Sequence, residues 1–114
     1  MIQRIQPGKR YSEAVIANGL VFLSGMVPEN TQEDATAQTA NVLTQIDALL
    51  AEVGSSKSRI VDATIYLADM ADYNAMNTAW DLWVEDGQAP ARATVEARLA
   101  NPEWKVEIKV TAAL

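Results

Sequence analysis

The sequence predicts an α+β fold in which one mixed sheet packs against two helices, with the element order ββαβαββ. Three observations predict it: an Asn-Gly dipeptide between two strand-like runs, two segments with apolar residues at helical spacing, and three β-branched or alternating runs. A chain of 114 residues is long enough for one layered core. We therefore expect a single domain over residues 1–114.

The first two strands are predicted to form a hairpin. Tyr11–Ala17 and Leu20–Ser24 flank Asn18-Gly19, the dipeptide that best tolerates positive φ at both central positions of a type I′ turn. The second arm, Leu20–Leu23, is apolar on both faces, so the helices can cover only one of them. In so short a chain, the expected cover for the other face is a second subunit.

Two helices follow from cap signals and apolar spacing. The first helix is expected to begin at Thr31-Gln32-Glu33-Asp34, which offers a hydroxyl cap followed by acids in the first turn. It is expected to end at Gly54, the C′ residue. The second opens at Asp72 and runs toward Gly87. The residues of the buried helix faces recur every three or four positions: Ala35, Thr39, Val42, Ile46, Leu49, Leu50 and Val53, and then Tyr73, Met76, Trp80 and Trp83.

The remaining strands are Ile60–Leu67, Arg92–Leu99 and Lys105–Thr111. In the last of them apolar residues alternate with charged ones, so the apolar set faces the helices and Glu107 points to the opposite side. The same rule turns Ala93, Val95, Ala97 and Leu99 inward. Arg92 and Glu107 are therefore predicted to share the sheet face that points away from the helices.

Composition excludes several kinds of site. The chain has no His and no Cys, which excludes a Ser-His-Asp triad, a Cys nucleophile, disulfides and His- or Cys-ligated zinc. Its formal net charge of −6 repels nucleic-acid phosphates. No apolar run approaches the ~20 residues that span a bilayer, and the N-terminus lacks a secretory apolar region, so we expect a cytoplasmic protein.

A set of motifs extends over nearly the whole chain: Tyr11–Val15, Ser24-Gly25, Tyr66–Met70, Asn77, Pro90-Ala91-Arg92 and Val106-Glu107-Ile108. Together they resemble the RidA/YjgF (reactive intermediate deaminase) family, and the segments ANVLTQIDALL, DATIYLAD and NPEWKVEIKV are most similar to its YoaB-like branch. The resemblance implies a chorismate-mutase-like sandwich that forms a homotrimer with sites between subunits. It also implies hydrolytic deamination of 2-imino acids such as 2-iminobutanoate and 2-iminopropanoate, in amino-acid metabolism, without metal or cofactor.

The chemistry of an imino acid makes Arg92 the leading candidate for substrate binding. Its guanidinium fork can donate two parallel hydrogen bonds to a planar carboxylate, which a lysine cannot do. Glu107 resembles the family residue that positions water or moves its proton, and a site without imidazole needs a carboxylate for this. By the same resemblance, the other substrate-binding residues are Tyr11 from a neighbouring chain, Ser24, Gly25, Asn77, and Thr94, where some relatives carry cysteine.

The residues also leave other interpretations open. Arg92 can instead form an ion pair across the sheet with Glu96 or Glu107, worth ~0.2–1 kcal/mol, and Trp104 fits a role in shaping its turn. The alternative function is a non-catalytic sensor of small carboxylates. A ribonuclease is disfavoured by the negative charge and the missing histidine. Met26 and the short segment after it depart from the family pattern, so the resemblance does not define the shape of the pocket.

Overall fold

The computed structural model describes residues 1–114 and has the element order βββαβαββ. The strands are β1 (Gln3–Pro7), β2 (Ser12–Ala17), β3 (Leu20–Leu23), β4 (Ile60–Leu67), β5 (Ala91–Glu96) and β6 (Val106–Ala113). The helices are α1 (Ala35–Glu52) and α2 (Tyr73–Trp83), and short 3-10 turns, Lys57–Arg59 and Met70–Asp72, precede β4 and α2. The predicted α+β class is confirmed, and the predicted order gains one strand, β1, at the N-terminus.

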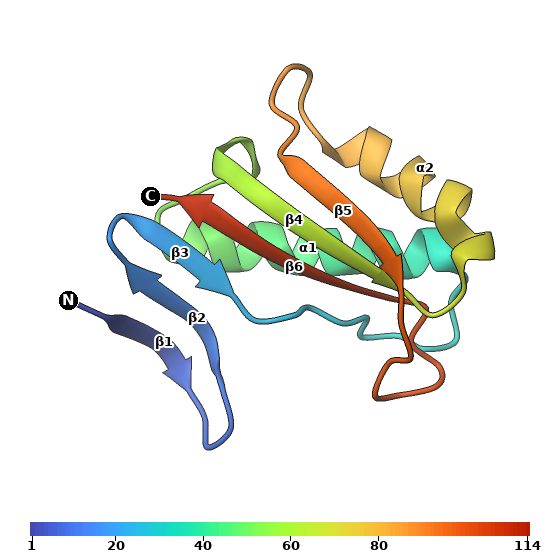
Figure 1. Ribbon diagram of the computed structural model, residues 1–114, viewed down its shortest axis with the longest axis horizontal. Helices are drawn as coiled ribbons and strands as arrows, with labels where there is room; N and C mark the ends of the chain where they lie inside the picture. The colour runs from blue at the N-terminus through green and yellow to red at the C-terminus, as the bar shows by residue number, and fades with distance from the viewer.

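The strands form one mixed sheet in the order β1-β2-β3-β6-β4-β5 (Figure 1). All neighbours are antiparallel except β4 and β5, which run parallel. A parallel pair needs a crossover connection, and α2 provides it. Because β4 lies between them, the last two strands of the chain are not neighbours in the sheet.

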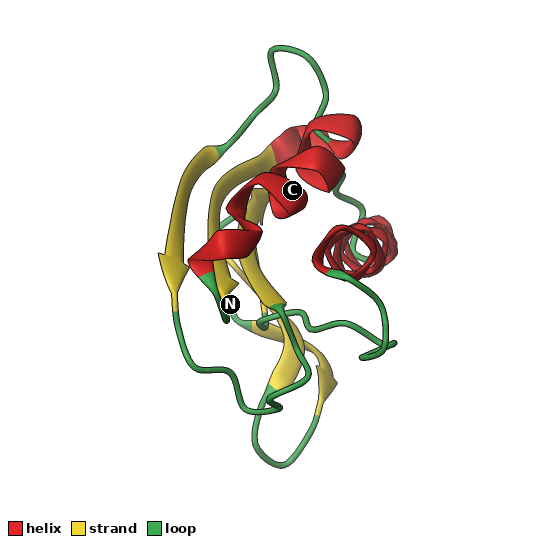
Figure 2. Cartoon of the chain, turned by 90° about the vertical axis from the view of Figure 1, so that its right-hand side faces the viewer, coloured by secondary structure: helices red, strands yellow, loops and turns green.

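Both helices cover one face of the sheet and leave the other face open (Figure 2). α1 packs against α2 and β6, and one cluster of 18 buried residues fills the space between the layers. On β4 and β6, the residues of this core are Ile60, Ala63, Ile65, Leu67, Val106, Ile108, Val110 and Ala112. Neither helix has the length and hydropathy needed to cross a membrane.

The sequence did not predict β1, which is an edge strand paired only with β2. Ile5 lies opposite Ala14 and is the one β1 residue that packs against the core, while the others are exposed. A strand with a single buried side chain has no alternating apolar pattern. The period-2 signal that identifies strands is therefore absent.

The ends of α1 correct one prediction and confirm another. The helix begins at Ala35, and its N-cap is Asp34, whose Oδ1 accepts a hydrogen bond of 2.9 Å from the Ala37 N–H. The predicted hydroxyl cap at Thr31 is therefore wrong, because the short carboxylate directly before the helix already satisfies the free N–H. Gly54 has a φ of 83° and donates to the Ala51 carbonyl, as expected of a C′ residue.

The hairpin and the start of α2 are as predicted. Asn18 and Gly19 have φ values of 51° and 75°, the geometry of a type I′ turn. α2 begins directly after Asp72. It ends at Trp83, ahead of the predicted Gly87, because the next residue already has an extended backbone.

The orientation of β5 is opposite to the prediction. Arg92 pairs with Ala63, and Thr94 pairs with Ile65; both partners are core residues under the helices. Val95, which was predicted to point inward, is 42% exposed. The prediction assumed that the apolar residues of the strand face the helices. A shift of the strand by one residue moves every side chain to the opposite face of the sheet. On this edge strand an arginine takes that face instead, because its guanidinium finds hydrogen-bond partners and an aromatic ring on α2.

Candidate functional site

The predicted site residues separate into two groups. The first, called the arginine group, lies between β5 and α2 and contains Arg92, Thr94 and Asn77. The second, called the glutamate group, lies where β2 and β3 meet β6 and contains Tyr11, Ser24, Gly25 and Glu107.

Arg92 is half-buried, and its guanidinium is held by neutral groups of α2. Nη1 donates to the Asn77 Oδ1 at 2.8 Å, and Nη2 donates to the Tyr73 hydroxyl at 3.2 Å. The guanidinium carbon lies 5.1 Å from the centre of a Trp80 ring and 5.9 Å from that of Tyr73, within the range of cation–π attraction. These contacts fix the guanidinium in place without neutralising its charge.

The ion pairs considered for Arg92 are not formed. The carboxylate of Glu96 accepts instead from the Met70 N–H at 2.9 Å and so caps the turn before α2. Glu107 lies on the other side of the sheet. The Arg92 charge therefore remains available to an anionic ligand.

The α2 sequence explains why these partners meet Arg92. Tyr73, Asn77 and Trp80 are separated by four and three residues, so they lie on one face of the helix. Met76, on the same face, is fully buried, and its sulfur lies 3.9 Å from the Arg92 Nη1. The apolar members of the face anchor α2 to the core, and the polar members face the arginine.

Thr94 has a buried hydroxyl with no hydrogen-bond partner. It follows Arg92 by two residues, so both side chains are on the helix face of β5. A buried polar atom without a partner costs roughly 1–3 kcal/mol. This hydroxyl is the one buried polar side-chain atom without a hydrogen-bond partner, and it lies on the same side of β5 as the arginine.

The glutamate group lines a cavity of about 320 Å³. Its walls are Tyr11, Ser24, Gly25, Val27, Trp104 and Glu107. The sequence therefore identified four of the six residues around this cavity. Glu107 is half-buried here.

Gly25 is required by the position of the Glu107 carboxylate. A methyl group at Gly25 would lie 2.1 Å from the Glu107 Oε2, far inside van der Waals contact. The two segments are brought together by Met26, which exchanges backbone hydrogen bonds of 2.8 and 3.0 Å with Ile108. The missing side chain at Gly25 thus lets the carboxylate lie against the backbone.

Ser24 and Tyr11 contribute to the cavity in different ways. The Ser24 hydroxyl donates to the Ser12 carbonyl at 2.5 Å, and the Ser24 N–H donates to the Glu13 carbonyl at 3.0 Å. The serine therefore ties the end of β3 to β2. Tyr11 is 64% exposed and presents its ring to solvent at the rim.

Arg92 and Glu107 do not share a sheet face, which corrects the prediction. Arg92 pairs with Ala63 of β4 and faces α2, whereas Glu107 pairs with Tyr66 of β4 and points to the open side. Ala63 and Tyr66 are three residues apart, so their side chains leave the strand on opposite faces. The error follows from the reversed orientation of β5.

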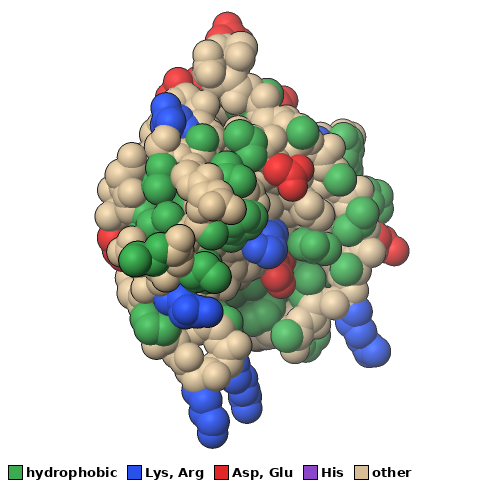
Figure 3. Space-filling view, turned by 60° about the vertical axis from the view of Figure 1, so that its left-hand side comes forward, with side chains coloured by type: hydrophobic (Ala, Val, Ile, Leu, Met, Phe, Trp, Pro, Cys, Tyr) green, Lys and Arg blue, Asp and Glu red, His purple; other side chains and the backbone are tan.

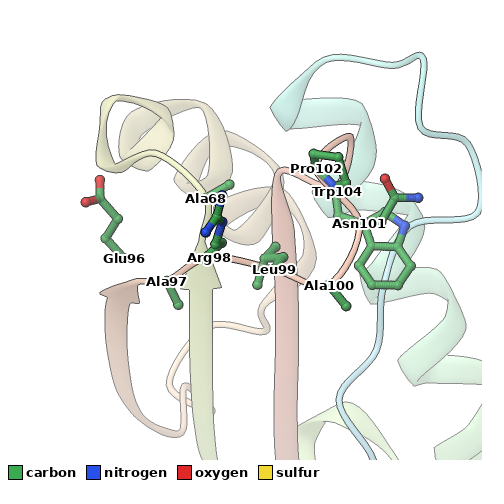
Figure 4. A pocket seen from close by; sticks show the side chains of 9 residues that line it. All are labelled: Ala68, Glu96, Ala97, Arg98, Leu99, Ala100, Asn101, Pro102 and Trp104. Carbon is green, nitrogen blue, oxygen red and sulfur yellow. The ribbon is translucent and has the colours of Figure 1, made fainter.

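The largest cavity lies away from both groups. It measures about 630 Å³ and opens at the ends of β4 and β5, where it is lined by Ala68, by the residues from Glu96 to Pro102 and by Trp104 (Figure 4). It shares only Trp104 with the glutamate cavity and contains none of the predicted site residues. Its size alone does not identify it as the functional site, because chemistry requires converging polar groups.

Sequence reasoning missed two residues of the site. Tyr73 was assigned to the buried face of α2 but is 39% exposed and contacts Arg92. Trp104 was assigned to its turn but also forms a wall of the glutamate cavity. The spacing of four residues between Tyr73 and Asn77 was the one available signal, because it places two polar groups on a single helix face. No group of three or more acidic side chains is arranged to hold a metal ion.

Comparison with known proteins identifies relatives along the entire chain. The family model described as endoribonuclease L-PSP matches residues 1–114. A protein of Escherichia coli (strain K12) named RutC family protein YoaB is 56% identical, over 99% of this chain and 98% of its own length. The Arabidopsis thaliana protein named Reactive Intermediate Deaminase A, chloroplastic, is 36% identical over 91% of this chain and 58% of its own length.

Solved structures also match this chain over nearly its whole length. The crystal structure of a YjgF family member from Neisseria meningitidis superposes with a TM-score of 0.96 at 63% identity, covering 99% of this chain and 94% of that one. A structure from Salmonella typhimurium, described as a putative translation initiation inhibitor, gives a TM-score of 0.92 at 57% identity, covering 99% and 97%. The fold of the chain is therefore that of its YjgF neighbours.

Proposed function

This chain belongs to the RidA/YjgF family, and we propose that it hydrolyses reactive 2-imino acids and their enamine tautomers to 2-keto acids and ammonia. The name of the plant relative, a reactive intermediate deaminase, supports this class of reaction. The simplest substrates of the class are 2-iminobutanoate and 2-iminopropanoate. Each carries a carboxylate next to the C=N carbon that water attacks.

The observation that carries the proposal is the uncompensated charge of Arg92. Its hydrogen bonds go to the neutral oxygens of Asn77 and Tyr73, and aromatic rings lie beside it. A guanidinium held in this way is a preorganised receptor for a carboxylate. The Thr94 hydroxyl, which is buried and has no hydrogen-bond partner within the chain, lies on the same side of β5.

A complete site requires a second copy of the chain in this proposal. Within one chain, β4 separates the arginine group from the glutamate group, and the two face opposite sides of the sheet. A single substrate therefore cannot contact both groups. We propose that Arg92, Asn77 and Thr94 of one copy meet Tyr11 and Glu107 of a neighbour in a homotrimer.

The open sheet face supports such an assembly. It exposes large apolar residues, including Phe22 and Val95, at 39% and 42%. From the side that carries β1, β2 and β3, hydrophobic side chains appear in several patches with isolated charged groups between them (Figure 3). Exposed apolar surface of this kind commonly marks an interface.

In the proposed reaction, Arg92 binds the substrate carboxylate and water adds to the imine carbon. Glu107 takes a proton from the water as the C–O bond forms and passes it to the imine nitrogen as the C=N π bond breaks, which gives a carbinolamine. Glu107 then takes the proton of the new hydroxyl and delivers it to the nitrogen, and the C–N bond breaks as the C=O bond forms, which gives ammonia and the keto group. One water is consumed for each ammonia released, and Glu107 is regenerated.

The proposal is tested by coupling the chain to an enzyme that generates 2-iminobutanoate and following ammonia release. We expect wild type to accelerate release over the uncatalysed reaction. Arg92→Ala should reduce kcat/KM by at least about tenfold, and Glu107→Gln should reduce kcat about a hundredfold. Arg98→Ala is the matched control, because Arg98 is an exposed arginine outside both groups and should leave the rate unchanged.

Other results would assign a different function. If a panel of imines gives no acceleration but 2-oxobutanoate raises the melting temperature through Arg92, the chain is a non-catalytic sensor of carboxylates. Strongly salt-dependent RNA binding would instead favour the ribonuclease activity in the family description. The net charge of −6 and the absence of histidine oppose that activity.

A further inference from the structure

Tyr73 lies on the solvent side of Arg92. The contact between the Arg92 Nη2 and the Tyr73 hydroxyl is at the surface, whereas the contact between Nη1 and Asn77 is partly buried. Tyr73 is 39% exposed, and Asn77 is half-buried. An anion that approaches Arg92 from solvent therefore reaches Tyr73 before it reaches Asn77.

The hydroxyl of Tyr73 has an unused donor. A phenol oxygen that accepts from a guanidinium keeps its own proton, which can be donated to another acceptor. No group of the chain accepts that proton. The Arg92 Nε also makes no hydrogen bond within the chain, so free donors of two residues lie side by side.

This arrangement matches the needs of a carboxylate. A carboxylate has two oxygens with about four lone-pair sites, and it commonly accepts from more than one donor. One oxygen can accept from the Arg92 guanidinium while the other accepts from the Tyr73 O–H. Tyr73 can keep its hydrogen bond with Arg92, because the phenol oxygen accepts from the guanidinium while the O–H donates to the carboxylate.

We propose that Tyr73 is a further substrate-binding residue, which donates its phenol proton to the carboxylate held by Arg92 and thereby selects anionic over neutral substrates. This inference rests on the proposed function, because it concerns the same site. It adds a residue of α2 to the carboxylate receptor. It also assigns Tyr73 a role that its place in the helical pattern did not suggest.

Tyr73→Phe isolates the proposed contact. The substitution keeps the ring beside Arg92, where its centre is 5.9 Å from the guanidinium carbon, and removes only the hydroxyl. Asn74→Ala is the control, because Asn74 is the next residue of α2 and is exposed. Melting temperatures of both variants should stay close to that of wild type.

The experiment measures binding of 2-oxobutanoate and of its neutral amide, 2-oxobutanamide, to wild type and both variants by calorimetry. Tyr73→Phe should weaken binding of 2-oxobutanoate by about tenfold or more, because hydrogen bonds to charged groups are the strong ones. Binding of the amide should change much less. In the imine assay KM should rise with kcat unchanged, since the contact is made equally before and during the chemical step.

The outcomes separate this inference from the proposed function. If wild type hydrolyses imines and Tyr73→Phe leaves KM and affinity unchanged, the inference is overturned and the function stands. If no imine is hydrolysed but Tyr73→Phe still weakens 2-oxobutanoate selectively, the inference stands and the function falls. Equal weakening of 2-oxobutanoate and 2-oxobutanamide binding, together with a lower kcat, would make Tyr73 a positioning residue for Arg92. Absence of 2-oxobutanoate binding to wild type would overturn both the inference and the proposed function.

Discussion

Arg92 and Glu107 show how local context decides what a charged residue can do. Arg92 makes no ion pair, since Glu96 is occupied by the Met70 N–H and Glu107 is on the opposite face. Its neutral partners leave a full positive charge at a fixed point on the helix side of β5. Glu107 lies against Gly25, which leaves the carboxylate room beside the backbone.

Gly25→Ala is predicted to impair the glutamate group without unfolding the chain. The new methyl would lie 2.1 Å from the Glu107 Oε2, so the carboxylate must move away. That carboxylate is the end of a flexible side chain, and we expect the free energy of unfolding to change by less than about 1 kcal/mol. The rate of imine hydrolysis should fall by about tenfold or more, because catalytic geometry tolerates little displacement.

The double variant supplies the control for this prediction. In a Glu107→Ala background, Gly25→Ala should cause no further loss of activity, because the group that it displaces is already absent. Additive losses would show that Gly25 acts through something other than Glu107. Full activity in the single variant would show that the position of this carboxylate is unimportant.

At the scale of the elements, the two helices do different work. α2 crosses from β4 to β5 and brings Tyr73, Asn77 and Trp80 over the arginine. α1 covers the centre of the sheet and packs on β6, the strand that carries Glu107. α1 therefore stabilises the scaffold, while one face of α2 contributes the side chains around Arg92 in the proposed carboxylate receptor.

The cap of α1 gives a stability prediction with a matched control. Asp34→Ala removes the acceptor of the Ala37 N–H and should lower the free energy of unfolding by about 1 kcal/mol. For a chain of this size, that corresponds to a fall in melting temperature of about 4 °C. Thr31→Ala should have a smaller effect, because Thr31 does not cap the helix. An equal or larger effect of Thr31→Ala would mean that the cap is assigned to the wrong residue.

At the scale of the whole molecule, the arginine group and the glutamate group can act on one substrate only if copies of the chain associate. In the proposed function, the arginine group supplies the carboxylate receptor without a base, and the glutamate group supplies the base without a receptor. One face of the sheet is covered by helices (Figure 2). The other face exposes apolar side chains such as Phe22 and Val95. In the proposed assembly, the open face of one copy, which carries Glu107, lies against the β5 edge of the next copy, which carries Arg92, so that apolar residues are buried and the two groups meet.

The assembly is tested by solution mass. We expect sedimentation to give a mass near three times the 12.4 kDa of the chain. Val95→Asp should lower both the mass and the imine hydrolysis, because a charge on the open face is costly to bury. Leu82→Asp is the control: Leu82 is 86% exposed on α2, and its substitution should leave the mass unchanged. A wild-type chain that is fully active at 12.4 kDa would rule out the shared site.

The parts of the fold that the sequence predicted depend on local pattern. The Asn18-Gly19 hairpin, the strand Ile60–Leu67 and the Gly54 end of α1 follow from turn chemistry, side-chain periodicity and backbone freedom. The resemblance to the RidA/YjgF family supplied the candidate residues, and the structure gathered them into two groups. β1 was not predicted, because a strand with one buried side chain has no alternation of apolar and polar residues.

By itself the sequence determined the class of fold, the central elements and the residue types available for chemistry, because each of these depends on neighbours along the chain. Only the tertiary structure decided that Arg92 faces α2 and Glu107 faces the open side. Alternation along a strand fixes which residues share a face, but not which face meets the helices. That choice depended on the contacts that the Arg92 guanidinium makes with α2 at the edge of the sheet, which join two separate elements of the chain.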